Sequence, residues 1–243
     1  MSLKGQIPEP NLLMSTDSMP PASLEPSAQL DRELEWQLAA DDLAPVRRWL
    51  AAHPALHQLR IDPLPPQRLR DTYLDTADWR VFRSGFALRQ RQAGTRAEAT
   101  LKSLRSARAD LADRREITET LPEGAAELAR LPGPVGAWLR HVIAAQPLRT
   151  LFMAQTLRER FAVHRGGQAR PAGEIALDET SLFGPSEAQL EQLLRVEVEV
   201  WDAEPGGLAP LVEALRQSCR LRPASENKFA AGVRAAGLAP PRE

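Results

Sequence analysis

The sequence predicts a mainly β protein of the α+β class, in which antiparallel strands close into an eight-stranded barrel and helices pack against the outside. Two observations support this prediction. Apolar and charged residues alternate with a period of two in segments spread along the whole chain, which is typical of strands with one buried face. Stretches with helical spacing are few. A sheet of so many strands avoids exposed edges by closing on itself.

The elements follow one another in a simple order. Residues 1–30 are rich in Pro and Ser and poor in charged and aromatic residues, so we expect a disordered tail followed by one folded domain over 31–238. The first strand alternates from Arg32 to Ala39, and a helix led by the acidic pair at 41–42 runs to residue 52. Further strands are expected at 67–75, 86–93, 96–104, 112–121, 148–164, 173–179 and 192–202, and further helices at 125–131, 134–145 and 207–219.

The composition narrows the possible partners. With 31 basic and 32 acidic residues, the chain has no net field to attract nucleic acid or an anionic membrane. Cys219 is the only cysteine, which excludes an internal disulfide and a cysteine-rich metal site. No run approaches the roughly 18 apolar residues of a membrane span, and the first residues lack the pattern of a secretory signal. We therefore expect a cytoplasmic protein; its oligomeric state is left open.

The polar faces of the predicted strands carry charged side chains with unusual regularity. On a single strand, such a face is ordinarily a solvated outer surface. Recurrence on seven strands favours another arrangement, in which the apolar faces pack outward against helices and the charged faces line a water-filled bore. The residues that share a polar face are Glu33 with Glu35, Arg89 with Arg91, Thr100 with Lys102, Arg114 with Glu116, Arg158 with Arg160, Glu174 with Asp178, and Glu197 with Glu199.

A bore with acidic and basic residues in similar numbers suits a polyanion accompanied by divalent cations. Carboxylate oxygens are hard ligands that hold Mg²⁺ or Mn²⁺. The guanidinium group of Arg and the ammonium group of Lys bind phosphate oxygens. The alternative is that the same basic and acidic groups form structural salt bridges with one another.

Several short motifs resemble those of one superfamily. Residues 33–37 resemble the E-x-E-x-K signature of CYTH proteins, also called triphosphate tunnel metalloenzymes. Residues 73–80 and 85–91 resemble the Y-x-D-T and G-x-A-L-R-x-R segments, while 100–102 and 114–116 resemble the T-L-K and R-x-E strands. The acidic residues at 174–178 and 197–199 and the terminal Asn227-Lys228 follow in the expected order. The resemblance covers about 31–238 and is closest to bacterial inorganic triphosphatases.

The resemblance implies a role for each charged residue of the bore. It implies Mg²⁺ (or Mn²⁺) as the cofactor, with Glu33, Glu35, Glu197 and Glu199 as its ligands. The substrate phosphates would be bound by Arg89, Arg91, Lys102, Arg114, Arg158, Arg160 and Lys228. Three further carboxylates, Glu116, Glu174 and Asp178, could position the attacking water, complete the metal shell or pair with arginines of the bore.

The implied function is metal-dependent hydrolysis of a small triphosphate. Inorganic triphosphate is the preferred substrate, because no feature of the sequence provides a pocket for a base. A thiamine or nucleoside triphosphatase, a class IV adenylyl cyclase and a non-catalytic polyphosphate-binding module stay open as alternatives. Two positions depart from the family pattern: Gln37 replaces the lysine of the first motif, and Asn227 replaces the serine before the last lysine.

Overall fold

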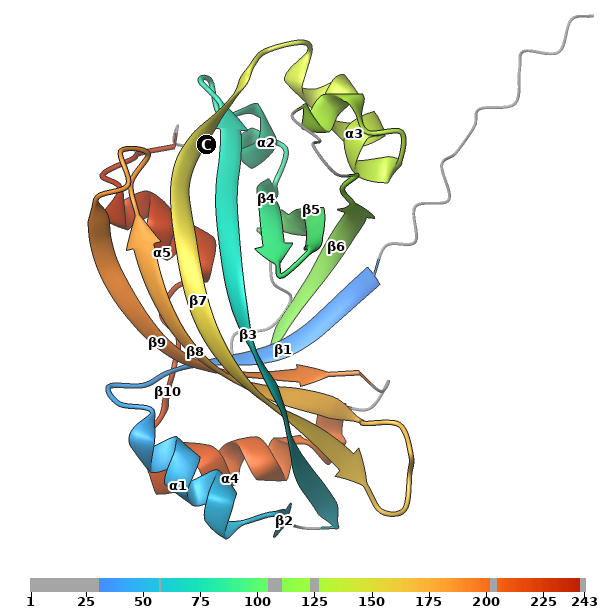
Figure 1. Cartoon of the computed structure of the whole chain (residues 1–243), viewed down its shortest axis with the longest axis vertical. Helices are drawn as coiled ribbons and strands as arrows, with labels where there is room; N and C mark the ends of the chain where they lie inside the picture. Colours follow the sequence, from blue (N-terminus) through green and yellow to red (C-terminus); the bar gives the residue numbers. More distant parts are fainter. Residues whose placement is uncertain (1–30, 57, 105–110, 123–126, 202–204, 241–243) are drawn as a thin grey trace, which may run out of the picture.

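The computed structural model describes residues 31–56, 58–104, 111–122, 127–201 and 205–240. The tail expected over 1–30 lies outside these ranges. Long curved strands dominate the described chain, and most of the helices lie at its two ends (Figure 1). The strands are β1 (Asp31–Ala39), β2 (Ala55–Leu56), β3 (Leu59–Thr76), β4 (Phe86–Ala93), β5 (Arg96–Ser103), β6 (Ala112–Thr120), β7 (Leu148–Arg165), β8 (Gly173–Phe183), β9 (Gln189–Val200) and β10 (Arg222–Pro223). The helices are α1 (Ala44–Ala52), α2 (Arg80–Arg83), α3 (Pro134–Ile143), α4 (Ala209–Cys219) and α5 (Lys228–Ala235), with short 3-10 turns at η1 (Leu128–Arg130) and η2 (Pro205–Gly207).

Eight of the strands form a closed antiparallel barrel. The order around the barrel is β1, β6, β5, β4, β3, β7, β8 and β9, and β9 pairs again with β1. Closure brings the first and the last long strands together, so that Glu35 lies opposite Glu199 and Gln37 lies opposite Glu197. The predicted eight-stranded barrel is therefore confirmed.

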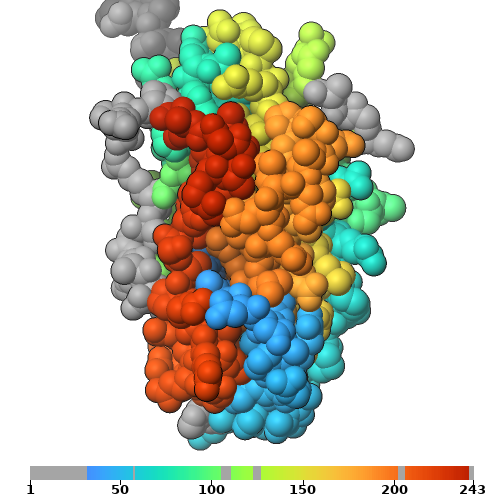
Figure 2. All heavy atoms as spheres, turned by 90° about the vertical axis from the view of Figure 1, so that its left-hand side faces the viewer, coloured from blue at the N-terminus to red at the C-terminus, as the bar shows by residue number. Residues whose placement is uncertain are grey.

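The apolar faces of the strands point outward, as the alternation predicted. At one end of the barrel, α1 and α4 pack side by side over an apolar cluster that includes Ile175, Val196 and Val198 (Figures 1 and 2). At the other end, α3 covers Leu88 and Leu101. Burial of these apolar side chains between strand and helix is the main force that holds the charged faces inward.

Helix α5 closes part of the barrel beside β7 and β8. Its side chains Phe229 and Val233 are buried together with Tyr73 and Phe152. The helix approaches so closely that a Cβ atom at Gly232 would lie 2.1 Å from the ring of Phe152. This position therefore requires glycine, and the close approach brings Lys228, the first residue of α5, into the barrel.

Some elements differ from those expected. Strand β3 begins at Leu59 because the segment with Pro63, Pro65 and Pro66 still pairs with β7, across a register shift between Leu64 and Gln67. Of the helix expected at 125–131, residues 125 and 126 lie outside the described chain, and η1 is a single 3-10 turn. The sequence did not predict α2 or α5, which are short.

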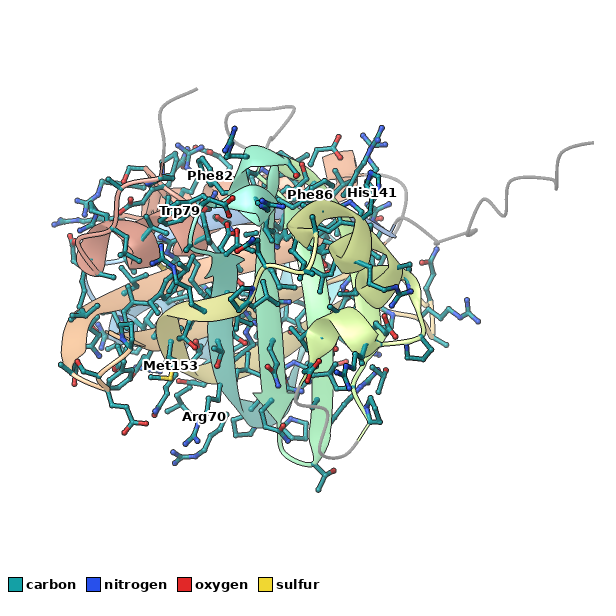
Figure 3. The ribbon with its side chains drawn as sticks, turned by 90° about the horizontal axis from the view of Figure 1, so that it is seen from above. Arg70, Trp79, Phe82, Phe86, His141 and Met153 are labelled. Atoms are coloured by element: carbon teal, nitrogen blue, oxygen red, sulfur yellow. The ribbon has the colours of Figure 1, made fainter. Side chains whose placement is uncertain are left out.

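One stretch of the outer wall is not covered by helices. Leu157 was expected to pack outward against a helix, but it is 40% exposed. Arg70 on β3 and Met153 on β7 project from the side of the barrel away from Trp79 and Phe82 (Figure 3). None of the helices described here is long and apolar enough to cross a membrane.

Candidate functional site

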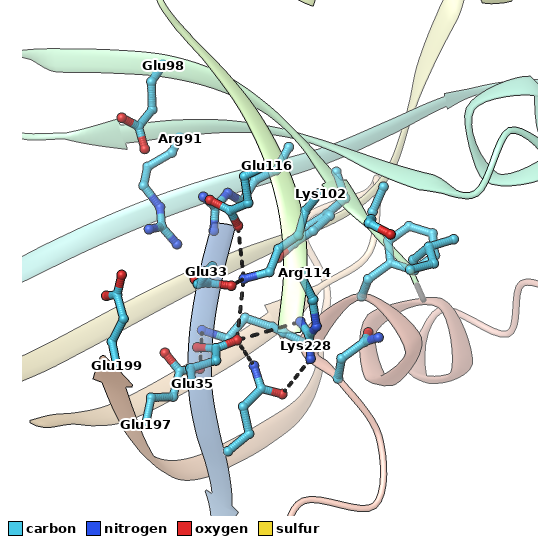
Figure 4. Close-up of a pocket in the computed structure, with 18 of the residues that line it drawn as sticks. Glu33, Glu35, Arg91, Glu98, Lys102, Arg114, Glu116, Glu197, Glu199 and Lys228 are labelled. Atoms are coloured by element: carbon cyan, nitrogen blue, oxygen red, sulfur yellow. Dashed lines mark hydrogen bonds and ion pairs between the residues drawn. The ribbon is translucent and has the colours of Figure 1, made fainter. Parts of the chain in front are cut away.

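Charged side chains gather in a cavity inside the barrel, where β1, β4, β5, β6, β7 and β9 face one another and α5 begins (Figure 4). The cavity has a volume of about 230 Å³. Strand parity therefore placed most of the candidate residues correctly on the inner face. The candidates that line the cavity are Glu33, Glu35, Arg89, Arg91, Lys102, Arg114, Glu116, Arg158, Glu197, Glu199 and Lys228.

Four carboxylates lie where β1 meets β9. Glu33 and Glu35 project from β1, and Glu197 and Glu199 project from β9. Burial raises the pKa of Glu35 to about 7, and the negative charges of Glu33 and Glu197 act in the same direction. The cations Lys102 and Arg114 oppose this shift only in part. Two acidic pairs from opposite ends of the chain thus meet only because the barrel closes.

Glu197 behaves in the opposite way because its neighbours are cations. Burial alone would raise its pKa, but Lys228 and Arg158 outweigh burial and lower it below the ordinary value. One Arg158 nitrogen, Nη2, donates to Glu197 Oε2 at 2.5 Å. Asp178 lies behind this pair and is fully buried. It accepts two hydrogen bonds of 2.7 Å from Arg158 and one of 3.1 Å from Lys228, so it holds both cations in place.

Lys102 lies at the centre of a second group of carboxylates. Its Nζ is 3.0 Å from Glu116 Oε1 and 3.4 Å from Glu35 Oε1, and it also contacts Glu33 Oε2. Burial alone would lower the pKa of Lys102, but these three carboxylates raise it well above its ordinary value. Lys102 and Arg89 in turn lower the pKa of Glu116, against the effect of burial. Both Lys102 and Glu116 are therefore ionised at neutral pH.

Gln37 bridges an anion and a cation in the same cavity. Its amide nitrogen donates to Glu35 Oε1 at 2.7 Å, and its amide oxygen accepts from Arg114 Nη2 at 3.3 Å. Arg114 Nη1 also lies 3.6 Å from Glu35. The residue that replaces the lysine of the family motif is thus in contact with two candidate site residues.

The two arginines of β4 are held differently. Arg91 forms a bidentate pair with the buried Asp71, with distances of 2.7 and 2.8 Å. Burial alone would raise the pKa of Asp71, but the bonds and the charge of Arg91 lower it to about 2. Arg89 forms no hydrogen bond or ion pair within the described chain, and its buried Nε has no acceptor there. Arg89 is thus a cation of the cavity that is free to bind an anion.

Three candidates do not line the cavity. Asp178 lies behind Arg158 and Lys228. Arg160 and Glu174 pair with each other from β7 and β8, with Nε 2.9 Å from Oε1 and Nη2 2.5 Å from Oε2. Their placement fits the expected pairing of acidic residues with arginines of the bore better than direct contact with the contents of the cavity.

Sequence reasoning missed several residues that share the inner face. Asp71 supports Arg91, and Arg195 lies two residues before Glu197 with only 5% of its surface exposed. The Nη1 atom of Arg195 has no acceptor in the described part of the chain. Arg195, Glu197 and Glu199 are every second residue of β9 and so share a face, which means that the alternation could have identified Arg195. The parity of β3 likewise places Asp71 inward.

The residues of the cavity fit a hard divalent cation. Buried carboxylate oxygens of Glu33 (Oε2) and Glu116 (Oε1) have no donor other than Lys102 among the described residues. Such oxygens are the ligands that Mg²⁺ and Mn²⁺ prefer. No three Asp, Glu, His or Cys side chains of the described ranges already converge in metal-binding geometry, because the carboxylates point towards the basic residues.

The fold and the cavity define a tunnel-like antiparallel barrel with a mixed acidic and basic interior. The profile of the CYTH domain matches residues 47–233, so the chain belongs to the CYTH family. The predicted superfamily is confirmed, and the match begins after the motif at 33–37. The comparisons do not single out bacterial inorganic triphosphatases.

Two solved structures illustrate the shared fold. A candidate adenylyl cyclase from Hippeastrum with a dominant triphosphatase activity is 19% identical, with a TM-score of 0.58 over 85% of this chain and 97% of its own. A candidate adenylate cyclase from Bacillus halodurans is 21% identical, with a TM-score of 0.54 over 82% of this chain and 97% of its own. No curated protein matches the chain. At these identities the likeness demonstrates the fold alone.

Proposed function

We propose that this protein is a metal-dependent triphosphatase that hydrolyses inorganic triphosphate to pyrophosphate and phosphate. The observation that carries the proposal is the juxtaposition, in one cavity, of four carboxylates from β1 and β9 with basic residues from five further elements. Carboxylates alone would bind cations, and basic residues alone would bind any anion. Together they suit a phosphate chain that carries its own divalent cations.

Glu33, Glu35, Glu197 and Glu199 would hold Mg²⁺ or Mn²⁺, which when bound offsets the charge that develops on the phosphate oxygens. Arg89 binds the phosphate chain directly, because it has no partner within the described chain to give up. Arg158 and Lys228 present fixed charges, because Asp178 holds them from behind. Positioning and electrostatics of this kind account for much of the acceleration in phosphoryl transfer.

The three remaining carboxylates separate into two roles. Glu116 lines the cavity and is ionised, so of the three it is the one placed to orient the attacking water by a hydrogen bond. Glu174 and Asp178 lie outside the cavity, where they accept hydrogen bonds from Arg160 and Arg158, and they act as positioning residues. Arg160, paired with Glu174, would contribute to the electrostatic potential of the bore without contacting the substrate.

A second candidate substrate is a triphosphate that carries an organic group. An apolar groove of about 460 Å³ adjoins the charged cavity, and Leu104, Asn227 and Phe229 line both. Phe82 and Phe229 face each other in the groove at 6.2 Å between ring centroids, with 21° between their planes. A flat aromatic group attached to the phosphate chain could stack there. This observation supports a thiamine or nucleoside triphosphatase as the second candidate function.

A phosphate-release assay on tripolyphosphate, ATP and thiamine triphosphate, each with and without Mg²⁺ or Mn²⁺, tests the proposal. We expect metal-dependent release, and highest kcat/KM on tripolyphosphate. Preference for an organic substrate would support the second candidate. Cyclic AMP and pyrophosphate from ATP would indicate an adenylyl cyclase. Tight tripolyphosphate binding without release from any substrate would indicate a non-catalytic binding module.

Filling the groove separates the two candidate substrates. Ala230 lines the groove but not the charged cavity, so Ala230→Phe should reduce kcat/KM for an organic triphosphate and spare tripolyphosphate. Ala51→Phe, on an exposed position of α1, is the matched control. An equal loss on both substrates would show that the groove does not contact an organic group.

A further inference from the structure

Lys102 differs from the other basic residues of the cavity in the number of carboxylates that surround it. Its Nζ contacts Glu33 and Glu35 from β1 and Glu116 from β6. Lys102 on β5 lies directly opposite Glu116 in the sheet register. The carboxylates of two neighbouring strands therefore converge on one ammonium group.

Two arginines of the bore are anchored in another way. Arg91 and Arg158 each form a bidentate pair with an aspartate behind them, Asp71 and Asp178. A guanidinium matched to one carboxylate in this manner has a fixed orientation. Lys102 has no such support, and its charge is a compact point at the end of a flexible stem. It neutralises several carboxylates at once, as a metal ion does.

The oxygens around Lys102 depend on one donor. Glu33 Oε2 and Glu116 Oε1 are buried and lie within ion-pair distance of Nζ, and neither has another donor among the described residues. Nζ is also 3.4 Å from Glu35 Oε1, so one ammonium group serves carboxylates of two strands. A divalent cation at the same place would supply more charge and direct coordination.

We infer that the Lys102 ammonium is a resident counter-ion which competes with the divalent cation for Glu33 and Glu35. The inference rests on the proposed function, in that the bore takes a metal and a phosphate chain together. When the metal binds, Lys102 leaves the carboxylates and turns to the phosphate oxygens. The stem of lysine allows this movement without any change in the strands.

The exchange couples the two binding events. Metal binding alone would leave the Lys102 ammonium without an anionic partner in a cavity where its side chain is only 19% exposed, which is unfavourable. A phosphate chain supplies the new partner. Metal and triphosphate should therefore bind with positive cooperativity, and by linkage each raises the affinity of the other by the same factor.

Calorimetric titration of the full chain with Mn²⁺ alone tests the competition without reference to turnover. Lys102→Met removes the charge and keeps a flexible apolar stem, so Mn²⁺ should bind at least about tenfold more tightly than to the wild type, given the Coulomb attraction of a partly buried pair. Arg89→Met is the matched control: it removes a charge from the same cavity that acts on Glu33 and Glu116 only through space, without a hydrogen bond or ion pair in the described chain. It should change Mn²⁺ affinity much less.

The coupling is measured by repeating the titrations with a triphosphate analogue whose bridging oxygens are replaced by NH groups. The analogue should tighten Mn²⁺ binding to the wild type, and this effect should largely vanish in Lys102→Met. Should that variant unfold, Lys102→Gln serves in its place. Equal or weaker Mn²⁺ binding by both Lys102 variants, or equal tightening in Arg89→Met, overturns the inference. Competition observed in a protein that hydrolyses no triphosphate would leave the inference standing and refute the proposed activity.

Discussion

Restoring the family lysine at position 37 is a sensitive test of how the cavity binds phosphate. Gln37 faces the bore between Glu35 and Arg114, with hydrogen bonds of 2.7 and 3.3 Å. In Gln37→Lys, the donor to Glu35 is retained and a positive charge is added. The acceptor for Arg114 is lost, and two cations become neighbours. The substitution should therefore strengthen the binding of a phosphate chain and destabilise the fold when the cavity is empty.

The size of both effects follows from the partial burial of the site. A single partly solvated ion pair contributes about 1 kcal/mol, which is several-fold in affinity. We expect kcat/KM for tripolyphosphate to rise several-fold at saturating metal, with a smaller gain for substrates of lower charge. In the absence of ligand, repulsion between the new lysine and Arg114 should lower the free energy of unfolding by about 1 kcal/mol.

Steady-state kinetics at saturating Mg²⁺ and urea denaturation without ligand measure the two effects. A fall in KM at constant kcat would place the new charge in ground-state binding, and a rise in kcat would place it in the transition state. Gln155→Lys adds the same charge at an exposed position of β7 and should change neither quantity. If Gln37→Lys leaves an active enzyme unaltered, position 37 does not contact the substrate. If it turns an inactive protein into an active one, the wild type is better described as a binding module.

Three further predictions follow from the charged network. Glu35→Gln or Glu199→Gln should abolish turnover with an unchanged circular dichroism spectrum, and near-wild-type phosphate release at limiting Mg²⁺ would exclude them as ligands. Asp178→Asn leaves two buried cations short of a partner and should lower the free energy of unfolding by roughly 3–5 kcal/mol, whereas Glu191→Gln, in an exposed pair, should cost at most about 1 kcal/mol. The pKa of Asp71 is lowered to about 2, so its contribution to stability is complete above its unfolded value near 3.9 and is lost as the pH falls through 2. Denaturation midpoints between pH 4 and 2 should thus decline less steeply in Asp71→Asn, and parallel curves would contradict this assignment.

The barrel and its inner face were predictable because they depend on a local regularity. Glu35, Lys102 and Glu197 each have an apolar neighbour in their own strand. When those neighbours face outward, the alternation of side chains along a strand turns the charged residues inward. The sequence could not reveal the closing contact between β1 and β9, which joins residues far apart in the chain; only the need to remove sheet edges suggested it.

The residues that were missed depend on contacts across the fold. Asp71, which was missed, supports Arg91 from a neighbouring strand, as the predicted candidate Asp178 supports Arg158. Nothing in their own segments distinguishes a supporting carboxylate from a ligand. The groove beside the cavity is likewise assembled from distant segments, with Phe82 from α2 and Phe229 from α5. The four residues of α2 are too few to show a helical period.

The central claim is that one bore binds a divalent cation and a triphosphate chain together. A crystal structure with Mn²⁺ and the imido analogue of triphosphate tests it most directly, since Mn²⁺ can be located by its anomalous scattering. We predict a manganese peak among Glu33, Glu35, Glu197 and Glu199, with the phosphate chain against Arg89 and with Lys102 turned from the carboxylates to a phosphate oxygen. Manganese or analogue bound only on the outer wall of the barrel, with Lys102 still among Glu33, Glu35 and Glu116, would contradict the account.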